Sequence, residues 1–268
     1  MFRLLDVSCD DSRLLKCFSS ADLAIGKGDA CVVQGDKLLE FGHVTGIVEK
    51  EGESESSVRG LPVVLRRATL QDQSKASENI LFSKTARRLC EEKIQELELG
   101  MVLVRVHYSF DRSRLTVDFT AGERVDFRQL VQTLATETHA RVEMRQIGVR
   151  DAAGIMGGMA PCGRRLCCSE WLKEFDNIHI RMAKIQGLSL SPTTINGMCG
   201  RLKCCLRFEN NCYRDMVREL PREGSRVACP EGSGKVVSTY VLSQRVKVLV
   251  DDQRVMEFDA SDVKMLGS

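Results

Sequence analysis

A seven-residue cysteine motif occurs twice in this chain and constrains it more than any other feature. Each copy reads Cys-Gly-Arg-x-x-Cys-Cys, at 162–168 and again at 199–205, and each follows a Gly-Met pair. The copies contain half of the twelve cysteines, namely Cys162, Cys167, Cys168, Cys199, Cys204 and Cys205. Cysteines repeated at the same offsets indicate one chemical task carried out twice. We interpret these six as a thiolate metal site.

The number of cysteines raises the question of the compartment in which the protein works. The N-terminus lacks an apolar core followed by a cleavage site, so no signal peptide is predicted. No run approaches the roughly 18 apolar residues that would span a bilayer. We therefore expect a cytoplasmic protein without a transmembrane segment. In a reducing cytosol, cysteines are metal ligands or redox thiols more often than disulfides.

The hydrophobic pattern predicts an α+β protein in four parts. Residues 1–70 read as a small β-barrel-like domain, with strands near 4–7, 14–18, 30–33 and 38–44 and a polar loop at 49–58. Residues 71–153 combine a long helix over 72–99 with a central ferredoxin-like α+β layer. A Cys-rich metal or cluster region is inserted at 154–218. Strands between 224 and 258 indicate an SH3-like β-barrel at 219–268.

The central layer is predicted in more detail. A strand at 102–110 pairs with another at 115–120 through a polar turn, and a further strand follows at 141–147. Asp126 is placed to cap a helix that runs to about Thr138, with Gln129 completing a capping box. We expect His107 and His139 to be structural, as isolated histidines beside apolar residues usually are.

The remaining six cysteines carry weaker signals. Cys90 falls on the long helix and is expected to be a buried core thiol. Cys212 follows Cys205 by seven residues and is a candidate auxiliary ligand. The other four are scattered or lie in strand patterns, and we interpret them as non-ligands: Cys9, Cys17, Cys31 and Cys229.

The first copy predicts its own local geometry. Cys162 follows a proline and precedes a glycine, so it should lie in a turn. Residues 169–172 can form a short helix with Cys167 and Cys168 in its first turn. There the helix dipole and two arginines, Arg164 and Arg165, would stabilise thiolates. Neighbouring helical residues point about 100° apart, so Cys167 and Cys168 should not reach one ion together.

Several assignments of the six thiols stay open from the residues alone. Zinc spacing fits Cys162 and Cys167 but leaves one cysteine over in each copy. Six thiols exceed the four of a closed zinc site or a four-cysteine cluster. Either two are structural, or each copy contributes to an incomplete site that a partner chain completes. Redox thiols, disulfides and six apolar core cysteines are the alternatives without metal.

Charge around the motifs is locally basic although the whole chain carries only +2. Between 160 and 210 there are eight basic and four acidic residues. Such a balance suits RNA phosphates or neutralises a cluster, and the candidate contacts are Arg164, Arg165, Arg201, Lys203 and Arg207. Aromatic residues make up 5% and form no stacking platform, so RNA binding is weakly supported. No catalytic constellation is present, so we do not expect an enzyme.

At these residues the chain resembles the YaaT/RicT family, bacterial proteins with the PSP1 C-terminal domain. The matching stretches are 108–115, 119–128, 145–151, 182–184, 188–192 and both cysteine motifs. The similarity is strong from about 100 to 210 and looser elsewhere. The six motif cysteines match those of the family position by position, whereas Cys212 and Cys229 do not.

The resemblance implies a cytoplasmic regulator without catalytic activity. It implies that the motif cysteines carry an iron–sulfur cluster, [4Fe-4S], in preference to zinc. It further implies a complex with two small partner proteins that supports mRNA maturation by the endonuclease RNase Y, with roles in sporulation, competence and biofilm formation. The alternative is a zinc-stabilised nucleic-acid-binding module, and a less favoured third hypothesis is a thiol redox enzyme.

Overall fold

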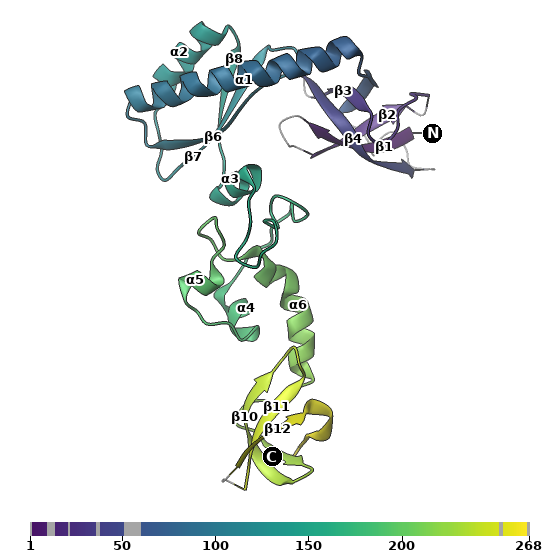
Figure 1. Cartoon of the computed structure of the whole chain (residues 1–268), viewed down its shortest axis with the longest axis vertical. Coiled ribbons are helices and arrows are strands. Elements are labelled where there is room, and N and C mark those ends of the chain that lie inside the picture. The colour runs from purple at the N-terminus through teal and green to yellow at the C-terminus, as the bar shows by residue number, and fades with distance from the viewer. Residues whose placement is uncertain are drawn as a thin grey trace. The chain divides into compact units, whose positions relative to one another are not determined.

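The computed structural model describes residues 2–9, 14–20, 22–35, 38–50, 60–251 and 254–266. They form two compact units, Met1–Ile155 and Met156–Ser268 (Figure 1). The strands fall into a closed barrel and two open sheets, and helices accompany them. The predicted α+β class is therefore confirmed, whereas the finer division into four parts stays a prediction.

A five-stranded barrel begins the first unit. Its strands are β1 (Phe2–Cys9), β2 (Leu14–Ser20), β3 (Ala30–Gln34), β4 (Leu39–Lys50) and β5 (Val63–Arg67), and they close in the order β1-β2-β5-β3-β4. Four of these strands were predicted and β5 was not. β4 continues to Lys50, into the predicted polar loop, whose residues 51–58 lie outside the described residues, as do residues 10–12 of the first turn.

Cysteines help to fill the barrel core. Cys17 and Cys31 are fully buried among Leu5, Val33 and other aliphatic side chains. Burial raises the pKa of Cys17 to about 12 and that of Cys31 to about 11. Both thiols therefore stay protonated near neutral pH, which agrees with their prediction as non-ligands.

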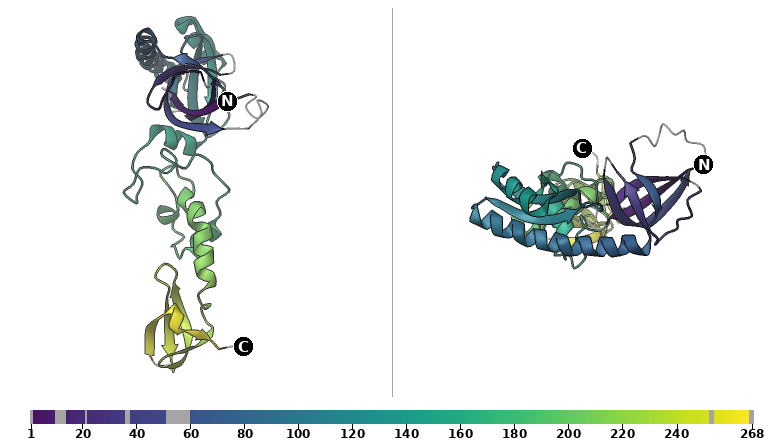
Figure 2. Two further views of the ribbon diagram at one scale, coloured as in Figure 1. Left: turned by 90° about the vertical axis from the view of Figure 1, so that its right-hand side faces the viewer. Right: turned by 90° about the horizontal axis from the view of Figure 1, so that it is seen from above.

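A long helix, α1 (Leu70–Glu96), runs from the barrel along the next sheet (Figure 2). Its N-cap is Thr69, whose side chain accepts a hydrogen bond from the backbone N–H of Asp72. The Asp72 carboxylate in turn accepts from the N–H of Thr69 at 2.8 Å, which completes a capping box. The helix ends at Glu96, three residues before the predicted end, because Glu98 adopts a left-handed backbone conformation (φ +49°) and the Leu99 N–H bonds back to the Ile94 carbonyl.

The capping carboxylate predicts a pH-dependent stability. The Arg66 guanidinium, together with Thr69, holds the pKa of Asp72 well below its usual range. Because the folded pKa is below the unfolded value of about 3.9, this stabilisation is complete above that pH and is lost as the pH falls. Asp72→Asn should lower the free energy of unfolding by about 1 kcal/mol at pH 7 and flatten its decline below pH 4. Urea unfolding followed by helical circular dichroism measures both effects, and an unchanged acid limb would contradict them.

The three-stranded sheet beside α1 contains β6 (Met101–Tyr108), β7 (Arg114–Ala121) and β8 (Arg141–Gln146), in that order. β6 and β7 form the predicted hairpin, and β8 runs parallel to β7 after α2 (Arg128–Thr138). A complete ferredoxin-like layer starts with a strand before its first helix. Here that part of the chain belongs to the barrel, so β8 pairs directly with β7.

The two faces of this sheet differ sharply. The face under α1 and α2 is apolar: Leu115, Val117 and Phe119 of β7 form one core with Leu130 and Leu134 of α2. Cys90 is fully buried in the same core, with its pKa raised to about 12, so the predicted core thiol is confirmed. The opposite face is polar and includes Thr116 and Asp118 of β7.

The predicted cap of α2 is wrong. The N-cap is Phe127, and no side chain caps it. Asp126 accepts a hydrogen bond from the N–H of Arg128 at 3.1 Å but mainly binds the guanidinium of the same residue, at 2.6 to 3.2 Å. The guanidinium competes with the helix terminus for the carboxylate. Gln129 therefore has no capping partner in Asp126.

The second unit starts near the end of α3 (Val149–Met156) and contains α4 (Ile180–Ile185), α5 (Pro192–Ile195) and α6 (Cys204–Arg218). An antiparallel sheet follows, with the order β12-β11-β10-β9-β13. Its strands are β9 (Arg226–Cys229), β10 (Gly232–Tyr240), β11 (Arg245–Val250), β12 (Arg254–Asp259) and β13 (Lys264–Met265). The four predicted strands are confirmed, and the SH3-like closure stays a prediction. Among the described helices, none is long and apolar enough to cross a membrane.

Candidate metal centre

The two cysteine motifs fold into the same small hairpin. Met159 bridges to Arg165 in the first copy, and Asn196 bridges to Leu202 in the second. The turn of each hairpin is closed by one glycine N–H: Gly163 donates to the Ala160 carbonyl, and Gly200 donates to the Gly197 carbonyl, both at 2.9 Å. Each bonded pair of the second copy follows its counterpart in the first copy by the number of residues that separates Cys162 from Cys199 in the sequence. The repeat is therefore structural as well as sequential.

The same register shows that the Gly-Met pairs lie outside the structural repeat. The Leu166 N–H donates to the Gly158 carbonyl, and its counterpart Lys203 donates to the Ile195 carbonyl. In this register Met159 corresponds to Asn196, whereas Met198 corresponds to Pro161. The Gly-Met pairs therefore occupy different places in the two hairpins and are not part of the repeated structure.

Glycine at the second motif position is required by the turn. Gly163 and Gly200 have φ values of +81° and +74°, in the left-handed region. A Cβ would meet no atom within 4 Å at either residue, so the constraint is conformational and not steric crowding. Cys162 thus lies in a turn, as predicted.

This constraint gives a direct test of the hairpin. Gly200→Ala should destabilise the second unit by about 1–2 kcal/mol, the cost of a side chain in the left-handed region. Gly197→Ala is the matched control in the same hairpin, because a Cβ there makes only ordinary contacts at 3.8 Å and its φ is not positive. Hydrogen exchange of the amides in 195–205 measures the effect, and equal protection in the wild type and Gly200→Ala would contradict it.

The chain differs after the two hairpins. Cys204 and Cys205 begin α6, so the second pair occupies the first turn of a helix. The predicted helix at 169–172 is wrong, because these residues form turns. The N–H groups of Ser169 and Glu170 both donate to the Leu166 carbonyl, at 3.0 and 3.2 Å. Trp171 packs edge-on against Phe208 of α6, with ring centroids 4.5 Å apart.

Thiols of the two hairpins meet. Cys167 and Cys204, which occupy equivalent positions, form a hydrogen bond with each other. Cys162 and Cys205 also lie near enough to Cys167 to interact with it electrostatically. Three of the other predicted ligands therefore interact with Cys167: Cys162 from its own copy, and Cys204 and Cys205 from the other.

Burial, and after it the neighbouring charged groups, raise the pKa values of two motif cysteines, Cys167 and Cys205. The pKa of Cys167 is raised by burial first and then by the neighbouring Cys204 and Cys162. The pKa of Cys205 is raised by burial, by Glu209 and by Cys167, against a smaller opposite effect of Lys203. The expectation that Arg164 and Arg165 stabilise a Cys167 thiolate is thus wrong for the protein by itself. Crowded thiols ionise readily only when a metal cation supplies the compensating charge.

The donor set fits a thiolate metal centre in its chemistry. A tetrahedral zinc site takes four ligands with zinc–sulfur bonds of about 2.3 Å, and the two copies together supply enough thiols for such a site. Within the described residues, however, no three cysteine, histidine or carboxylate side chains are grouped closely enough to hold an ion as they stand. Cys162 and Cys205 would approach by changing rotamer, for which the exposed Cys162 has room.

The other cysteines lie elsewhere. Cys212 is exposed on α6, two turns or about 10 Å beyond Cys205, so a ligand role for it would require a separate centre. The Cys229 thiol donates to the Gly232 carbonyl in the C-terminal sheet. Cys9 is buried like Cys17 and Cys31. These positions agree with the predicted separation of the motif cysteines from the rest.

Three of the five predicted basic contacts serve the local fold. Arg207 binds Asp176 at 2.8 Å, and Arg165 binds Glu170 at 3.1 Å. The Lys203 ammonium donates to the Thr194 carbonyl. Arg164 and Arg201 are exposed at equivalent hairpin positions, and their contact with RNA stays a prediction.

Two residues that contact or influence the motif cysteines were not predicted from the sequence. Lys173 donates to the carbonyls of Cys168 and Ser169, at 3.3 and 2.7 Å, and holds the turn that replaces the predicted helix. Glu209 lies one helical turn after Cys205 and raises its pKa. The four-residue spacing on a helix is the signal that would have identified Glu209.

Two family models and two known proteins match parts of the chain. Residues 62–147 match the PSP1 C-terminal conserved region, and residues 177–220 match the third domain of PSP1-like proteins. The chain is 42% identical to Stage 0 sporulation protein YaaT of Bacillus subtilis over 86% of its own length and 84% of that protein. It is 28% identical over 94 residues, 35% of the chain, to an uncharacterized protein of Schizosaccharomyces pombe, of which this is 12%. No solved structure matches the chain.

Proposed function

Because this chain belongs to the PSP1 family of Stage 0 sporulation protein YaaT, we propose that it is a non-catalytic regulatory adaptor built around an iron–sulfur centre. It would act in the cytoplasm as part of a multiprotein complex that supports RNA processing. The partners implied by the resemblance are two small regulatory proteins and the endonuclease RNase Y.

The observation that carries this proposal is the meeting of thiols across the two hairpins. Cys162 and Cys167 from the first copy approach Cys204 and Cys205 from the second. Four thiolates are the ligand set of a [4Fe-4S] cluster. When bound, such a cluster supplies one-electron chemistry whose potential depends on its hydrogen bonds and exposure. The protein residues would bind it and join the two copies around it.

This arrangement changes the interpretation of the adjacent cysteine pairs. We propose that Cys162, Cys167, Cys204 and Cys205 would together form one four-thiol centre within the chain, which would not need a partner to complete it. Cys168 and Cys199 are then left from the predicted six. We propose that they serve a second centre whose remaining ligands come from a partner chain.

Metal analysis of anaerobically purified protein tests the iron–sulfur proposal. The expected result is brown protein containing iron and acid-labile sulfide in similar amounts. Colourless protein with stoichiometric zinc and no iron would reject the cluster in favour of a zinc site, which four thiolates also satisfy.

The zinc-containing alternative, a nucleic-acid-binding module, is favoured by one feature. Arg164 and Arg201 are exposed at equivalent positions of the two hairpins, where both could contact phosphates. RNA binding that weakens steeply with salt and is lost in Arg164→Gln and Arg201→Gln would support this module. Absence of binding at low salt would leave the adaptor as the function.

The adaptor role is tested in the host. Deletion of the gene should lengthen or stabilise the precursor transcripts that RNase Y processes, and the wild-type chain should restore their maturation. A Cys167→Ser chain, expressed at the same level, should not restore it. Normal transcript ends in the deletion strain would contradict the proposed role in RNA processing.

A further inference from the structure

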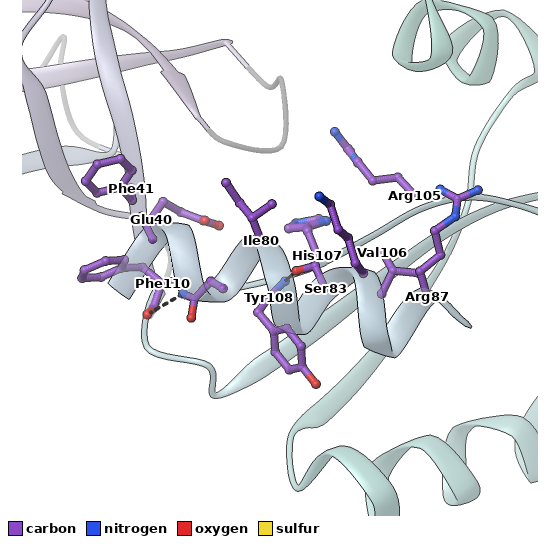
Figure 3. Close-up of a pocket in the computed structure, with 13 residues that line it drawn as sticks. Glu40, Phe41, Ile80, Ser83, Arg87, Arg105, Val106, His107, Tyr108 and Phe110 are labelled. Atoms are coloured by element: carbon purple, nitrogen blue, oxygen red, sulfur yellow. Dashed lines mark hydrogen bonds between the residues drawn. The ribbon is translucent and has the colours of Figure 1, made fainter. Parts of the chain in front are cut away.

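The three-stranded sheet of the first unit has two edge strands that differ in what covers them. Its order is β6-β7-β8, so among the described strands β6 and β8 each have one side without a strand partner (Figure 1). Along β6, side chains of α1 take up outward backbone groups. Arg87 donates to the Val104 carbonyl at 3.0 Å, and the Tyr108 N–H donates to the Ser83 hydroxyl at 3.3 Å (Figure 3). The edge at β6 is therefore closed to another strand.

The outward backbone groups of β8 follow from its pairing with β7. The two strands run parallel without a register shift. The Arg141 N–H donates to the Ser113 carbonyl, and the Ile147 N–H donates to the Phe119 carbonyl. Because backbone groups alternate between the two sides of a strand, the even-numbered residues direct their N–H and C=O away from β7. These residues are Val142, Met144 and Gln146. Within the described part of the chain, no backbone or side-chain group bonds to these outward groups.

The strand β8 is suited to pairing along this edge. Edge strands are commonly protected by a proline, a bulge or a very short length. Over its whole length of six residues β8 contains no proline, and it pairs with β7 without a bulge. Charged side chains also protect an edge, and β8 carries three of them on its polar face: Arg141, Glu143 and Arg145. The order of these charges decides which strand can add.

A second copy of β8 fits this edge when it runs antiparallel, about a two-fold axis perpendicular to the sheet. With Met144 opposite Met144 of the second copy, every outward-facing residue of β8 lies opposite another, and each such pair exchanges two hydrogen bonds. The same register places Glu143 opposite Arg145 of the second copy, on both sides of the axis. These are non-hydrogen-bonded pairs, in which opposed side chains lie closest together.

Charge selects this register over its neighbours. A shift of the second copy in one direction places Glu143 opposite Glu143, and a shift in the other direction places Arg145 opposite Arg145. Like charges directly opposite each other destabilise a strand pair. Larger shifts leave less of the strand paired. The strand is therefore complementary to itself in the one register that uses all of its outward groups.

Both faces of β8 accept this arrangement. On the polar face, Glu143 binds Arg114 and Arg145 lies 3.6 Å from Asp118, yet both side chains are 41% exposed and have surface for a second partner. On the apolar face, Val142 and Met144 are partly buried against the core of the first unit. Met144 of each copy would cover its counterpart, and the apolar layer under α2 would continue across the axis.

We propose that two copies of this chain join through β8, so that their two three-stranded sheets form one continuous sheet. A second copy is the occupant, because the edge matches itself in both backbone groups and charge. The joined sheet would have about six strands, a common size for open sheets. The proposal concerns the first unit and does not depend on the metal centre.

Sedimentation equilibrium of the anaerobically purified full chain tests the proposal, together with hydrogen exchange of single amides at low and high protein concentration. The chain should dimerise as its concentration rises. The Glu143 and Arg145 amides, which face β7, should be protected at both concentrations. The Met144 amide should exchange at least about tenfold more slowly in the dimer, because only there does it have a hydrogen-bond partner.

A charge reversal gives the matched pair of variants. Glu143→Arg places like charges opposite each other on both sides of the axis and should weaken the dimer at least about tenfold. Glu92→Arg makes the same change of charge at an exposed position of α1, the helix that packs along β6, and should change the dimer less than twofold. If Glu143→Arg does not fold, the exchange pattern of the wild type still decides the question.

Four results would overturn the proposal. They are a monomer at every concentration, a dimer in which exchange of the Met144 amide is unchanged, protection of that amide already in the monomer, and equal weakening by Glu143→Arg and Glu92→Arg. A monomer whose Met144 amide becomes protected only when another protein is added would assign the edge to an extended segment of that protein, and would also overturn pairing between copies.

Discussion

Replacing Cys204 with serine should remove the metal from the proposed four-thiol centre, whereas the same replacement at Cys199 should leave that metal bound. Cys204 forms a hydrogen bond with Cys167, and Cys162 and Cys205 interact with Cys167 electrostatically. Loss of one of four thiolates leaves an incomplete ligand set for a cluster or a structural zinc site. Cys199 occupies the turn of the second hairpin and is not among the thiols that interact with Cys167.

Elemental analysis of the anaerobically purified variants gives the measurement. Metal per chain should fall to near zero in Cys204→Ser and in Cys167→Ser, and should stay at least at the level of one centre in Cys199→Ser. Cys212→Ser is the matched control, since it changes an exposed cysteine of the same helix. Amide exchange of the β9–β11 strands shows whether the second unit is folded. Equal loss in folded Cys199→Ser and Cys204→Ser would contradict the four-thiol assignment.

The contact behind this prediction could not be obtained from the sequence. Repetition of the motif predicts that two segments fold alike, and the paired bonds of Gly163 and Gly200 agree with this. It contains no information on whether the two hairpins meet, because that depends on packing over residues between them. Ile178, Met182 and Ala183 form this packing with Leu206. Spacing alone therefore does not distinguish a site shared by the two copies from an incomplete site in each copy.

Tertiary contacts also explain the wrong helix after the first motif. Residues 169–172 have acceptable helix propensity, but their side chains form tertiary contacts that do not fit a helix at this place. Trp171 packs on Phe208, Glu170 binds Arg165, and Lys173 holds two carbonyls of the turn. A four-residue helix contributes too little to compete with these contacts. After the second motif, fifteen residues form α6, and its buried side chains stabilise it.

The strands show a similar division between local and distant causes. Most were predicted because alternating apolar residues face the core over several positions. β5 was missed, since only Val64 of its five residues is buried and Arg66 and Arg67 follow. Its place is fixed by pairing with β3 in the barrel, which a local pattern does not contain.

On the polar face of the central sheet, the alternation of apolar and polar residues does not predict which polar side chains are buried. Asp118 alternates with Val117 and Phe119 on β7, so it points away from the apolar core. Alternation alone would leave it in solvent, yet its side chain is fully buried. In the register of the sheet, Arg105 on β6 and Arg145 on β8 flank it from both sides. Arg105 donates to one carboxylate oxygen at 2.9 Å, and Arg145 lies 3.6 Å from the other.

Asp118→Ala should therefore lower the free energy of unfolding of the first unit by about 3–5 kcal/mol. The reason is not the strength of the ion pair but what the substitution leaves behind. The Arg105 side chain is 15% exposed, so its charge would stay largely buried with its main partner removed. Glu143→Ala is the matched control on the same face. The Glu143 side chain is 41% exposed and binds Arg114, and its loss should cost less than about 1 kcal/mol.

Hydrogen exchange of the β7 amides measures this change for the first unit alone, because strongly protected core amides exchange through global opening of the unit. A double variant separates charge burial from loss of packing. Arg105→Met with Asp118→Leu removes both charges and keeps apolar volume, so most of the stability lost in Asp118→Ala should return. If the double variant were as unstable as the single one, the penalty would come from packing and not from the unpaired arginine. If Asp118→Ala and Glu143→Ala had equal effects, burial of the carboxylate would have no energetic role.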